Sequence, residues 1–236
     1  MLRMSILISG AEGSGKDAII RRVRHLLPWM KLGAKATTRD PRADDWDVLT
    51  GVSKYEYLSV EEFMRLRRLG VIVEHSQNAT GGLYGAMMDF AGADYEIRDL
   101  DVNGALQLMG KSALSANFPH VIPIGILPPY RSHPDILDGP DGLLGLFRGY
   151  PARDGMRDVL IAEMQDVITQ RLESRGDTPQ AIKQKLARSE WEIPEILRSW
   201  PHVVINDELD EAVTQVVEII QRAIQQDGFT RQNLSH

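Results

Sequence analysis

The sequence contains no cysteine, and this absence excludes several kinds of chemistry. Without Cys in its 236 residues, the chain has no disulfide bonds, thiolate zinc sites or cysteine nucleophiles. The six histidines are scattered, and none is spaced from another as paired metal ligands are. A site built on cysteine or on clustered histidine is therefore not expected.

Long hydrophobic runs are also missing. No apolar stretch approaches the roughly 20 residues of a membrane span. The N-terminal run at residues 5–9 is shorter than the roughly 7–15 apolar residues of a signal peptide core. We therefore expect no membrane partner and a cytoplasmic location.

Basic residues are in the minority, since 27 Lys and Arg stand against 33 Asp and Glu, a net charge of −6. A nucleic-acid backbone requires a surplus of Lys and Arg, so nucleic acid is not expected as a partner. A compact anionic ligand remains possible, because it needs only a local basic cluster. The hydrophobic content of 43% is typical of a soluble globular protein, and the length fits one domain.

Short apolar runs alternate with helical patterns along the chain. The alternation predicts a parallel sheet built from βαβ units. Residues 35–45 have the composition of a loop, the glycines around 81–85 predict a tight turn, and the tail from 228 is expected to fray. The expected strands are 5–9, 55–58, 71–73, 95–101, 121–127 and 203–205, and the expected helices are 16–27, 59–69 with a capping box at Ser59 and Glu62, 102–116, one from 156, and 210–225.

A glycine-rich segment follows the first expected strand and opens the first expected helix. It fits the pattern G-x-x-x-x-G-K with the residues Gly10, Ala11, Glu12, Gly13, Ser14, Gly15 and Lys16. Glycines let several main-chain N–H groups point at one anion, the helix N-terminus adds partial positive charge, and Lys16 can reach the β- and γ-phosphates of ATP. Asp17 stands where the pattern has a Ser or Thr magnesium ligand, and it could hold Mg²⁺ or serve as a helix N-terminal charge.

Together with this loop, a series of segments resembles the guanylate kinases, which are P-loop nucleoside monophosphate kinases. The segments follow one another in the family's order over most of the chain. They are TTRDPR at 37–42, YEYLSVEEF at 55–63, GVIVE at 70–74, LYG at 83–85, DLDVNGA at 99–105, ILPP at 126–129, RLESRG at 171–176 and VINDEL at 204–209.

The resemblance implies a P-loop NTPase-like three-layer α/β fold with a central parallel sheet. Residues 1–34, 94–129 and 201–226 would form the core, 35–93 a subdomain that binds the monophosphate, and 130–200 an insertion and lid region. The stretch 130–170 is longer than usual. Within it, residues 130–150 are expected to be a surface excursion, a lid or a dimer contact, in a protein that is a monomer or a homodimer.

The resemblance also implies roles for individual residues in a reaction that transfers phosphate from MgATP to GMP or dGMP. Arg39 and Arg42 would clamp the acceptor phosphate with help from Tyr55 and Tyr84, while Glu74 and Asp101 would accept from guanine. Residues Gly10–Asp17 would bind ATP through the loop amides and through Lys16. Asp17 and Asp99 would lie near Mg²⁺. Arg171, Arg175 and Lys185 would close over the transferring group.

Several of these positions also have a purely structural interpretation. The arginines could be solvated surface charges, the tyrosines packing residues, Glu74 an exposed strand-end carboxylate, and Asp99 and Asp101 helix caps. Lys35 replaces a Ser that contacts the guanine O6 in the family, so Lys35 either donates to that oxygen or marks a different ligand. The alternatives are a kinase for a modified nucleotide or a ribose bisphosphate-type sugar phosphate, and a non-catalytic guanylate-kinase-like binding domain.

Overall fold

The computed structural model describes residues 4–42, 45–46, 51–77, 81–88, 94–115, 118–131, 142–148 and 154–234. Two compact units divide the chain. Unit 1 comprises Met1–Leu7 and Arg24–Ile122, and unit 2 comprises Ile8–Val23 and Pro123–His236. The predicted boundaries of the core, the monophosphate subdomain and the lid remain predictions.

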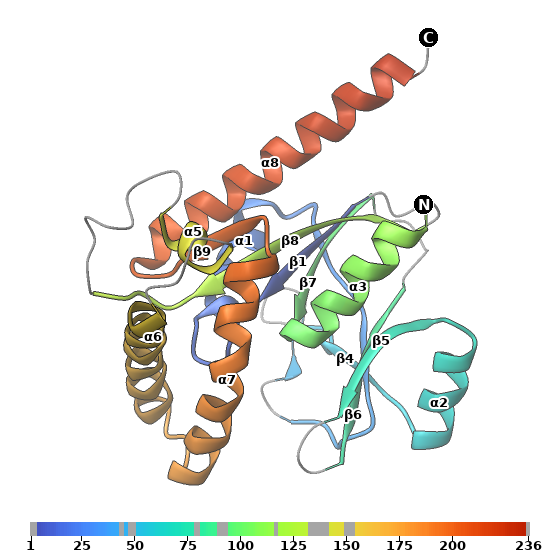
Figure 1. Cartoon of the computed structure of the whole chain (residues 1–236). Coiled ribbons are helices and arrows are strands. Elements are labelled where there is room, and N and C mark those ends of the chain that lie inside the picture. The colour runs from blue at the N-terminus through green and yellow to red at the C-terminus, as the bar shows by residue number, and fades with distance from the viewer. Residues whose placement is uncertain are drawn as a thin grey trace. The chain divides into compact units, whose positions relative to one another are not determined.

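The central sheet has five strands in the order β2-β7-β1-β8-β9, and the expected α/β class is confirmed (Figure 1). The strands are β1 (Met4–Ser9), β2 (Lys31–Leu32), β7 (Tyr95–Leu100), β8 (His120–Leu127) and β9 (His202–Ile205). The pairs β2/β7 and β8/β9 are parallel. Every residue of β1 is buried, which accounts for its continuous apolar run, because strands of a parallel sheet are covered on both faces.

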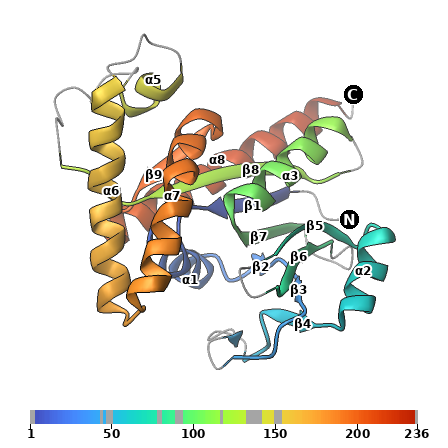
Figure 2. The same ribbon diagram turned by 60° about the horizontal axis from the view of Figure 1, so that its bottom comes forward.

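A second sheet of four strands lies in unit 1, in the order β4-β3-β6-β5 (Figure 2). Its strands are β3 (Lys35–Thr37), β4 (Tyr55–Tyr57), β5 (Ile72–Gln77) and β6 (Leu83–Met87). Two predictions were wrong here, since Lys35–Thr37 lies in a strand where a loop was expected, and Leu83–Met87 forms a strand where a tight turn was expected. Both strands are too short to show an alternating pattern, and pairing with each other stabilises them.

The helices of unit 1 are α2 (Val60–Arg68) and α3 (Val102–Leu114). Ser59 caps α2 as expected, because its side chain accepts from the N–H of Glu62. The carboxylate of Glu62 contacts Arg65, at 2.7 Å, so the structure shows the Ser59 half of the expected capping box. Phe63 is fully buried on α2 and packs with Ala36 of β3 and Ile72 of β5, which attaches this helix to the small sheet.

Unit 2 contains α1 (Lys16–Leu26), α5 (Gly142–Arg148), α6 (Asp154–Ser174), α7 (Pro179–Ser199) and α8 (Leu209–Leu234). Helices α6 and α7 lie side by side, as Figures 1 and 2 both show. The buried face of α6 consists of Leu160, Met164, Ile168 and Leu172. Helix α8 extends beyond the expected 210–225, to Leu234, and the expected fraying from residue 228 stays a prediction. Most of the excursion expected at 130–150 lies outside the described residues.

Candidate functional site

The glycine-rich loop of unit 2 connects β1 to α1, as its pattern predicts. Gly13 and Gly15 have φ angles of 87° and 92°, in the left-handed region that glycine adopts without steric cost. Gly10 approaches the carbonyl oxygen of Ile126 in β8, where an added Cβ would lie 2.4 Å away. Glycine is therefore required at positions 13 and 15 by the backbone conformation, and at position 10 by the lack of space for a side chain.

The loop presents unsatisfied donors. Among the described residues, nothing accepts from the N–H groups of Gly15, Lys16 and Asp17 at the start of α1, as expected for the first turn of a helix. The Oγ of Ser14 is buried and has no hydrogen-bond partner in the described part of the chain. No carboxylate in that part pairs with the ammonium group of Lys16. These groups can bind an anion, because each donor lacks an internal acceptor.

Two side chains, those of Arg171 and Asn206, donate hydrogen bonds to a main-chain carbonyl of this loop. Arg171 donates from Nη1 to the carbonyl of Ser14 at 3.1 Å and from Nη2 to the carbonyl of Asn206 at 2.9 Å. Asn206 donates from Nδ2 to the same Ser14 carbonyl at 2.8 Å. Burial lowers the pKa of Arg171. Arg171, expected in a lid, therefore contacts the main chain of the phosphate loop.

The other two predicted lid cations share one carboxylate. Arg175 donates to Asp177 at 2.8 Å, and Lys185 lies 2.6 Å from Asp177 and 3.0 Å from Glu12 in the loop. Hydrogen bonds from Arg175 and Lys185 hold the pKa of Asp177 below its ordinary value. The structure thus brings Arg175 and Lys185 together, and Lys185 contacts the loop itself.

In unit 1, Arg39 is held at the centre of a polar group. Its Nη1 and Nη2 donate to the two carboxylate oxygens of Asp45 at 2.6 and 2.5 Å, and its Nε donates to the Tyr84 hydroxyl at 2.9 Å. The bond to Asp45 raises the pKa of Arg39 and holds the pKa of Asp45 well below its ordinary value. Asp45 also accepts from the Tyr57 hydroxyl and from the N–H of Arg42, each at 2.7 Å.

Aromatic rings surround the Arg39 guanidinium. The guanidinium carbon lies 5.2 Å from the centroid of the Tyr55 ring and 5.8 Å from that of Tyr84. Burial raises the pKa of Tyr55, so its hydroxyl is a neutral donor near pH 7. The side chain of Arg42 is exposed and has no ion-pair partner among the described residues. Arg39, Tyr55 and Tyr84, which were predicted to bind the acceptor phosphate, are therefore close together. The Arg42 side chain is exposed on the segment that follows Arg39.

Glu74 and Asp101 are neighbours. A Cβ added at Gly104 would lie 2.8 Å from Glu74 Oε2 and 3.2 Å from Asp101 Oδ1. The strand register shifts between Ile72 and Glu74, as at a β-bulge. The Glu74 residue that follows the buried apolar residues of β5 is only 7% exposed. Burial and the charge of Asp101 raise the pKa of Glu74 to about 7. The hydrogen bond that Glu74 accepts from the N–H of Ala86 has the opposite effect and lowers this pKa. Asp101 also caps α3 through the N–H of Gly104.

Lys35 lies beside this pair at the start of β3. Its Nζ is 2.8 Å from Asp99 Oδ2 and 5.7 Å from the centroid of the Tyr55 ring. Its charge lowers the pKa of Glu74. Lys35 is thus part of the predicted acceptor group, and its ammonium contacts a carboxylate.

Asp17 is the side chain that best fits a magnesium ion. It is exposed in the first turn of α1, and Mg²⁺ needs one or two carboxylates together with phosphate and water oxygens. Asp99, the second predicted ligand, is bonded to Lys35. Within the described residues there is no cluster of three or more acidic or histidine side chains that could form a protein cage.

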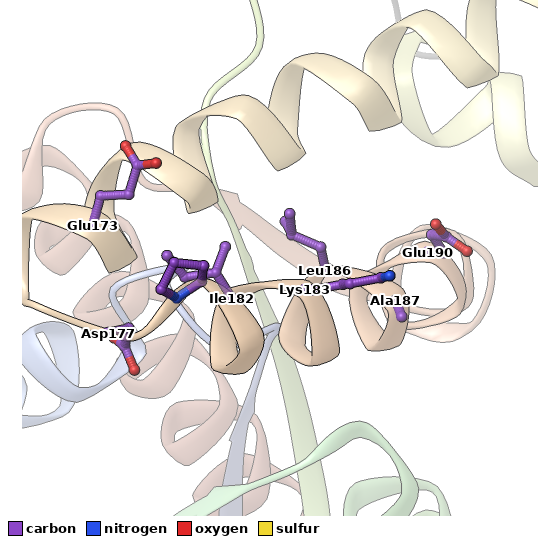
Figure 3. A pocket seen from close by; sticks show the side chains of 8 residues that line it. Glu173, Asp177, Ile182, Lys183, Leu186, Ala187 and Glu190 are labelled. Carbon is purple, nitrogen blue, oxygen red and sulfur yellow. The ribbon is translucent and has the colours of Figure 1, made fainter.

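A hollow of about 550 Å³ lies along α6 and α7, and Asp177, the partner of Arg175 and Lys185, is one of its lining residues. Figure 3 shows its lining, with Glu173 on α6 and Ile182 and Leu186 on α7. None of the residues assigned above to phosphate or base binding lines it. In the part of the chain that the structure describes, no helix has both the length and the apolar character needed to cross a bilayer.

Sequence reasoning missed Asn206, Asp45 and Asp177. Asn206 belongs to the VINDEL segment used for the resemblance, but nothing in the sequence says which carbonyl it contacts. Asp45 follows Arg39 by six residues in a segment with no periodic pattern. Asp177 lies close in sequence to Arg175, and an acidic residue so near a proposed catalytic arginine was a usable signal.

Comparisons with known proteins agree with this geometry. The chain is 28% identical over 221 residues to the guanylate kinase of Gloeobacter violaceus, covering 91% of this chain and 85% of that protein. It is 29% identical over 219 residues to the guanylate kinase of Chlorobium luteolum, with 90% and 88% covered.

No protein-family model matches the chain. The crystal structure of guanylate kinase from Anaplasma phagocytophilum superposes with a TM-score of 0.58 at 17% identity, over 94% of this chain and 86% of that one, which shows a shared P-loop NTPase fold. Over most of its length the chain is therefore similar to curated guanylate kinases, and it shares the fold of a solved guanylate kinase.

Proposed function

We propose that the protein phosphorylates GMP or dGMP with ATP as phosphate donor. The observation that carries the proposal is that one chain contains two different anion-binding groups, the loop amides with Lys16 in unit 2 and the Arg39–Tyr84 group in unit 1. Phosphoryl transfer depends on positioning two phosphates and neutralising their charge, and it requires no protein nucleophile. The curated relatives are guanylate kinases.

Each unit would hold one substrate. The N–H groups that open α1 and the ammonium of Lys16 would bind the β- and γ-phosphates of ATP. Arg39, Arg42 and the hydroxyls of Tyr55 and Tyr84 would bind the phosphate of the acceptor, because guanidinium forks match phosphate oxygens. The acceptor phosphate then supplies the attacking oxygen.

The base would be read by Glu74 and Asp101. Guanine offers two kinds of donor, N1–H and the 2-amino group, and the two carboxylates meet at Gly104. A purine without these donors would leave buried acceptors unpaired, which costs binding free energy. Lys35 would donate to the 6-keto oxygen, in a position where adenine has an amino group.

Mg²⁺ would be held by Asp17 together with phosphate oxygens. The ion supplies charge neutralisation for the transferring phosphate when it is bound. Arg175 and Lys185 would supply further positive charge, and for this they must exchange Asp177 for phosphate oxygens. The cytoplasmic location and the monomeric or homodimeric state remain predictions.

The test is a coupled assay of ADP release across a panel of acceptors. GMP and dGMP should be phosphorylated, whereas AMP, pyrimidine monophosphates and ribose bisphosphate should be poor acceptors. Turnover of ribose bisphosphate without turnover of GMP would contradict the assignment of Glu74 and Asp101. ATP binding without transfer to any acceptor would indicate a binding domain.

A further inference from the structure

We infer that Arg98 is a positioning residue for recognition of the acceptor base, acting through main-chain carbonyls next to Lys35 and Ala86 and without contacting the nucleotide. The inference rests on the proposed reading of guanine by Glu74 and Lys35. Arg98 was not among the predicted site residues. It lies in β7 of the central sheet and is only 1% exposed, although arginine is almost never fully buried unless it is paired.

Glu96 compensates the buried charge of Arg98. The two residues are two positions apart in β7, so their side chains project from the same face of the strand. Arg98 Nε lies 2.5 Å from Glu96 Oε1, and Nη2 lies 2.9 Å from Oε2, a bidentate pair that fixes the orientation of the guanidinium. Ser5 of β1 donates its hydroxyl to Glu96 Oε1 at 2.8 Å. The pair is therefore anchored on two strands of the central sheet.

The same guanidinium also bonds to the small sheet of unit 1. Nη2 donates to the carbonyl of Met87, at the end of β6, at 2.7 Å, and Nη1 donates to the carbonyl of Ala34, directly before β3, at 3.3 Å. The Ala34 carbonyl also accepts from the N–H of Met87 at 2.9 Å. Arg98 therefore bonds to both strands at the point where they pair with each other, and it joins them to β7.

The two carbonyls adjoin the residues proposed to read the base. Lys35 and Ala86 are paired in the small sheet, and each is the sequence neighbour of one of the bonded carbonyls. The N–H of Ala86 donates to Glu74 Oε1 at 2.8 Å, so a shift of this peptide would move a donor away from the carboxylate. Burial raises the pKa of Glu74, and the charges of Lys35 and Arg98 lower it. Arg98 thus acts on the base-reading group by position and by charge.

Close packing leaves the Arg98 side chain one place to lie. A Cβ added at Gly33 would lie 2.6 Å from Arg98 Cγ and 3.0 Å from Cζ. The N–H of Gly33 donates to the carbonyl of Ile97 in β7 at 2.8 Å, so the segment between β2 and β3 is held directly against the side chain. A change in the shape of residue 98 is therefore passed on to the main chain that leads into β3.

The experiment compares the full chain with the double variant Glu96→Leu, Arg98→Met, which removes both buried charges together. Apolar replacement of a buried ion pair is often neutral for stability, so denaturant unfolding should show a similar free energy of unfolding. We expect the KM for GMP to rise about tenfold, because two carbonyls lose a charged donor. The KM for ATP and kcat at saturating GMP should change by about twofold or less, as for lost ground-state binding of one substrate.

The affinity for AMP separates recognition of the base from recognition of the phosphate. AMP carries the same phosphate as GMP and lacks the N1–H and 2-amino donors of guanine. In the double variant its affinity should change by about twofold or less, so the ratio of GMP to AMP affinity should fall with the affinity for GMP.

Arg98→Lys tests for rescue by a conservative change. It keeps a positive charge beside Glu96, but an ammonium lacks the planar fork that reaches two carbonyls and a carboxylate at once. The KM for GMP should lie between the values of the unaltered protein and the double variant. Arg148→Met is the matched control, because Arg148 in unit 2 also donates to two main-chain carbonyls, those of Leu197 at 3.0 Å and of Trp200. It should change none of these quantities.

Three outcomes would overturn the inference. An unchanged KM for GMP in the folded double variant would show that the base-reading group does not depend on Arg98. Equal losses of GMP and AMP affinity would show that the effect is not on base recognition. An equal rise in the KM for ATP, or the same loss in Arg148→Met, would indicate general destabilisation.

If the double variant does not fold, Arg98→Lys decides. A raised KM for GMP with an unchanged KM for ATP supports the inference, and an unchanged KM for GMP overturns it. The unaltered protein is assayed first, since its failure to phosphorylate GMP would refute the proposed function and this inference with it. Failure of the inference alone leaves that activity intact.

Discussion

The loop of unit 2 offers an anion the N–H groups of Gly15, Lys16 and Asp17, whereas unit 1 offers the side chains of Arg39, Tyr55 and Tyr84. Main-chain donors keep their hydrogens at all ordinary pH values, and their directions depend on peptide planes. Side-chain donors depend on rotamers and on charged neighbours. The proposed binding of an anion therefore depends on backbone geometry and on the ammonium of Lys16 in unit 2, and on charge and protonation in unit 1.

Each arrangement needs a supporting residue. Asn206 holds a carbonyl in unit 2, and Asp45 holds a guanidinium in unit 1. In unit 2 a neutral amide donates to the carbonyl, while in unit 1 a carboxylate matches the fork geometry of the guanidinium and compensates its charge. The comparison teaches that in both units a second residue of the same unit bonds to the proposed phosphate-binding group, an amide in unit 2 and a carboxylate in unit 1.

The largest expected effect is on the unit 2 side, from Lys16→Ala. Loss of this ammonium should lower kcat by about 100- to 1000-fold, as for removal of one preorganised charge-stabilising donor, while binding of GMP to unit 1 persists. The coupled ADP assay and a GMP titration measure the two quantities. Lys183→Ala, which removes an exposed lysine of α7, serves as control. Unchanged kcat in Lys16→Ala would contradict the role of the loop.

The corresponding change in unit 1 is Asp45→Asn. The KM for GMP should rise about ten- to hundredfold, because a hydrogen bond to a charged group is lost and Arg39 is released, while the KM for ATP should not change. Asp40→Asn, at an exposed position of the same loop, is the control. A lower KM for GMP would show instead that Asp45 competes with the acceptor phosphate for Arg39.

The base selectivity of unit 1 should change near neutral pH, because burial and the charge of Asp101 raise the pKa of Glu74 to about 7. Only the ionised carboxylate accepts from both guanine donors, so the ratio of GMP to AMP affinity should increase by about tenfold between pH 6 and pH 8. The ratio cancels the ionisation of the phosphate that both nucleotides share. In Glu74→Gln the ratio should be flat with pH, and a persistent slope would exclude Glu74 as its source.

The same residue affects stability with a definite sign. Because the folded chain holds the Glu74 proton more tightly than the unfolded chain, the contribution of Glu74 to the free energy of unfolding is full below its ordinary pKa of 4.5 and is lost as pH rises through about 7. Glu74→Gln should therefore gain stability relative to the natural chain as pH rises from 5 to 8. Denaturant unfolding at the two pH values measures this difference, and a constant difference would contradict the raised pKa.

The smallest expected effect comes from Lys35→Ser. Removing the ammonium removes a charge that lowers the pKa of Glu74, so the midpoint of the GMP-to-AMP pH profile should move to higher pH. The affinity for GMP itself should fall by about fivefold or less, as for a partly exposed ion pair. Lys31→Ser, on an exposed residue of β2, should change neither quantity. A midpoint that stays in place would remove Lys35 from the base-reading group.

The elements around the glycine-rich loop and the start of α2 were predicted well, whereas the 21-residue helix α7 was not among the expected helices. The run before the glycines, the helix after them and the Ser59 cap all follow from local rules, and the structure agrees. Strands β3 and β6 were missed because strands of three and five residues owe their conformation to each other. The composition of each segment alone favours a loop.

The candidate site divides in the same way. The loop glycines could be recognised from spacing, because their role is conformational and local. The partner of Arg39 could not, because Asp45 is chosen by the fold of an irregular loop. From its motif, Arg171 was expected to close over the transferring group, and this role stays a prediction. What the motif did not indicate are its bonds to the carbonyls of Ser14 and Asn206, which lie 157 and 35 positions away in the sequence.

By itself, the sequence determined the β1–loop–α1 unit, the alternation of strands and helices, and which charged residues stand at the ends of strands. Periodicity, glycine conformation and helix capping act over a few residues, so they can be read from the order of the residues. The tertiary structure alone decided that Glu74 and Asp101 meet at Gly104, that Asp45 bonds to Arg39, and that Asn206 donates to the Ser14 carbonyl of the glycine-rich loop. These contacts depend on chain segments brought together by folding, and their energies come from burial and from directional hydrogen bonds that no local pattern encodes.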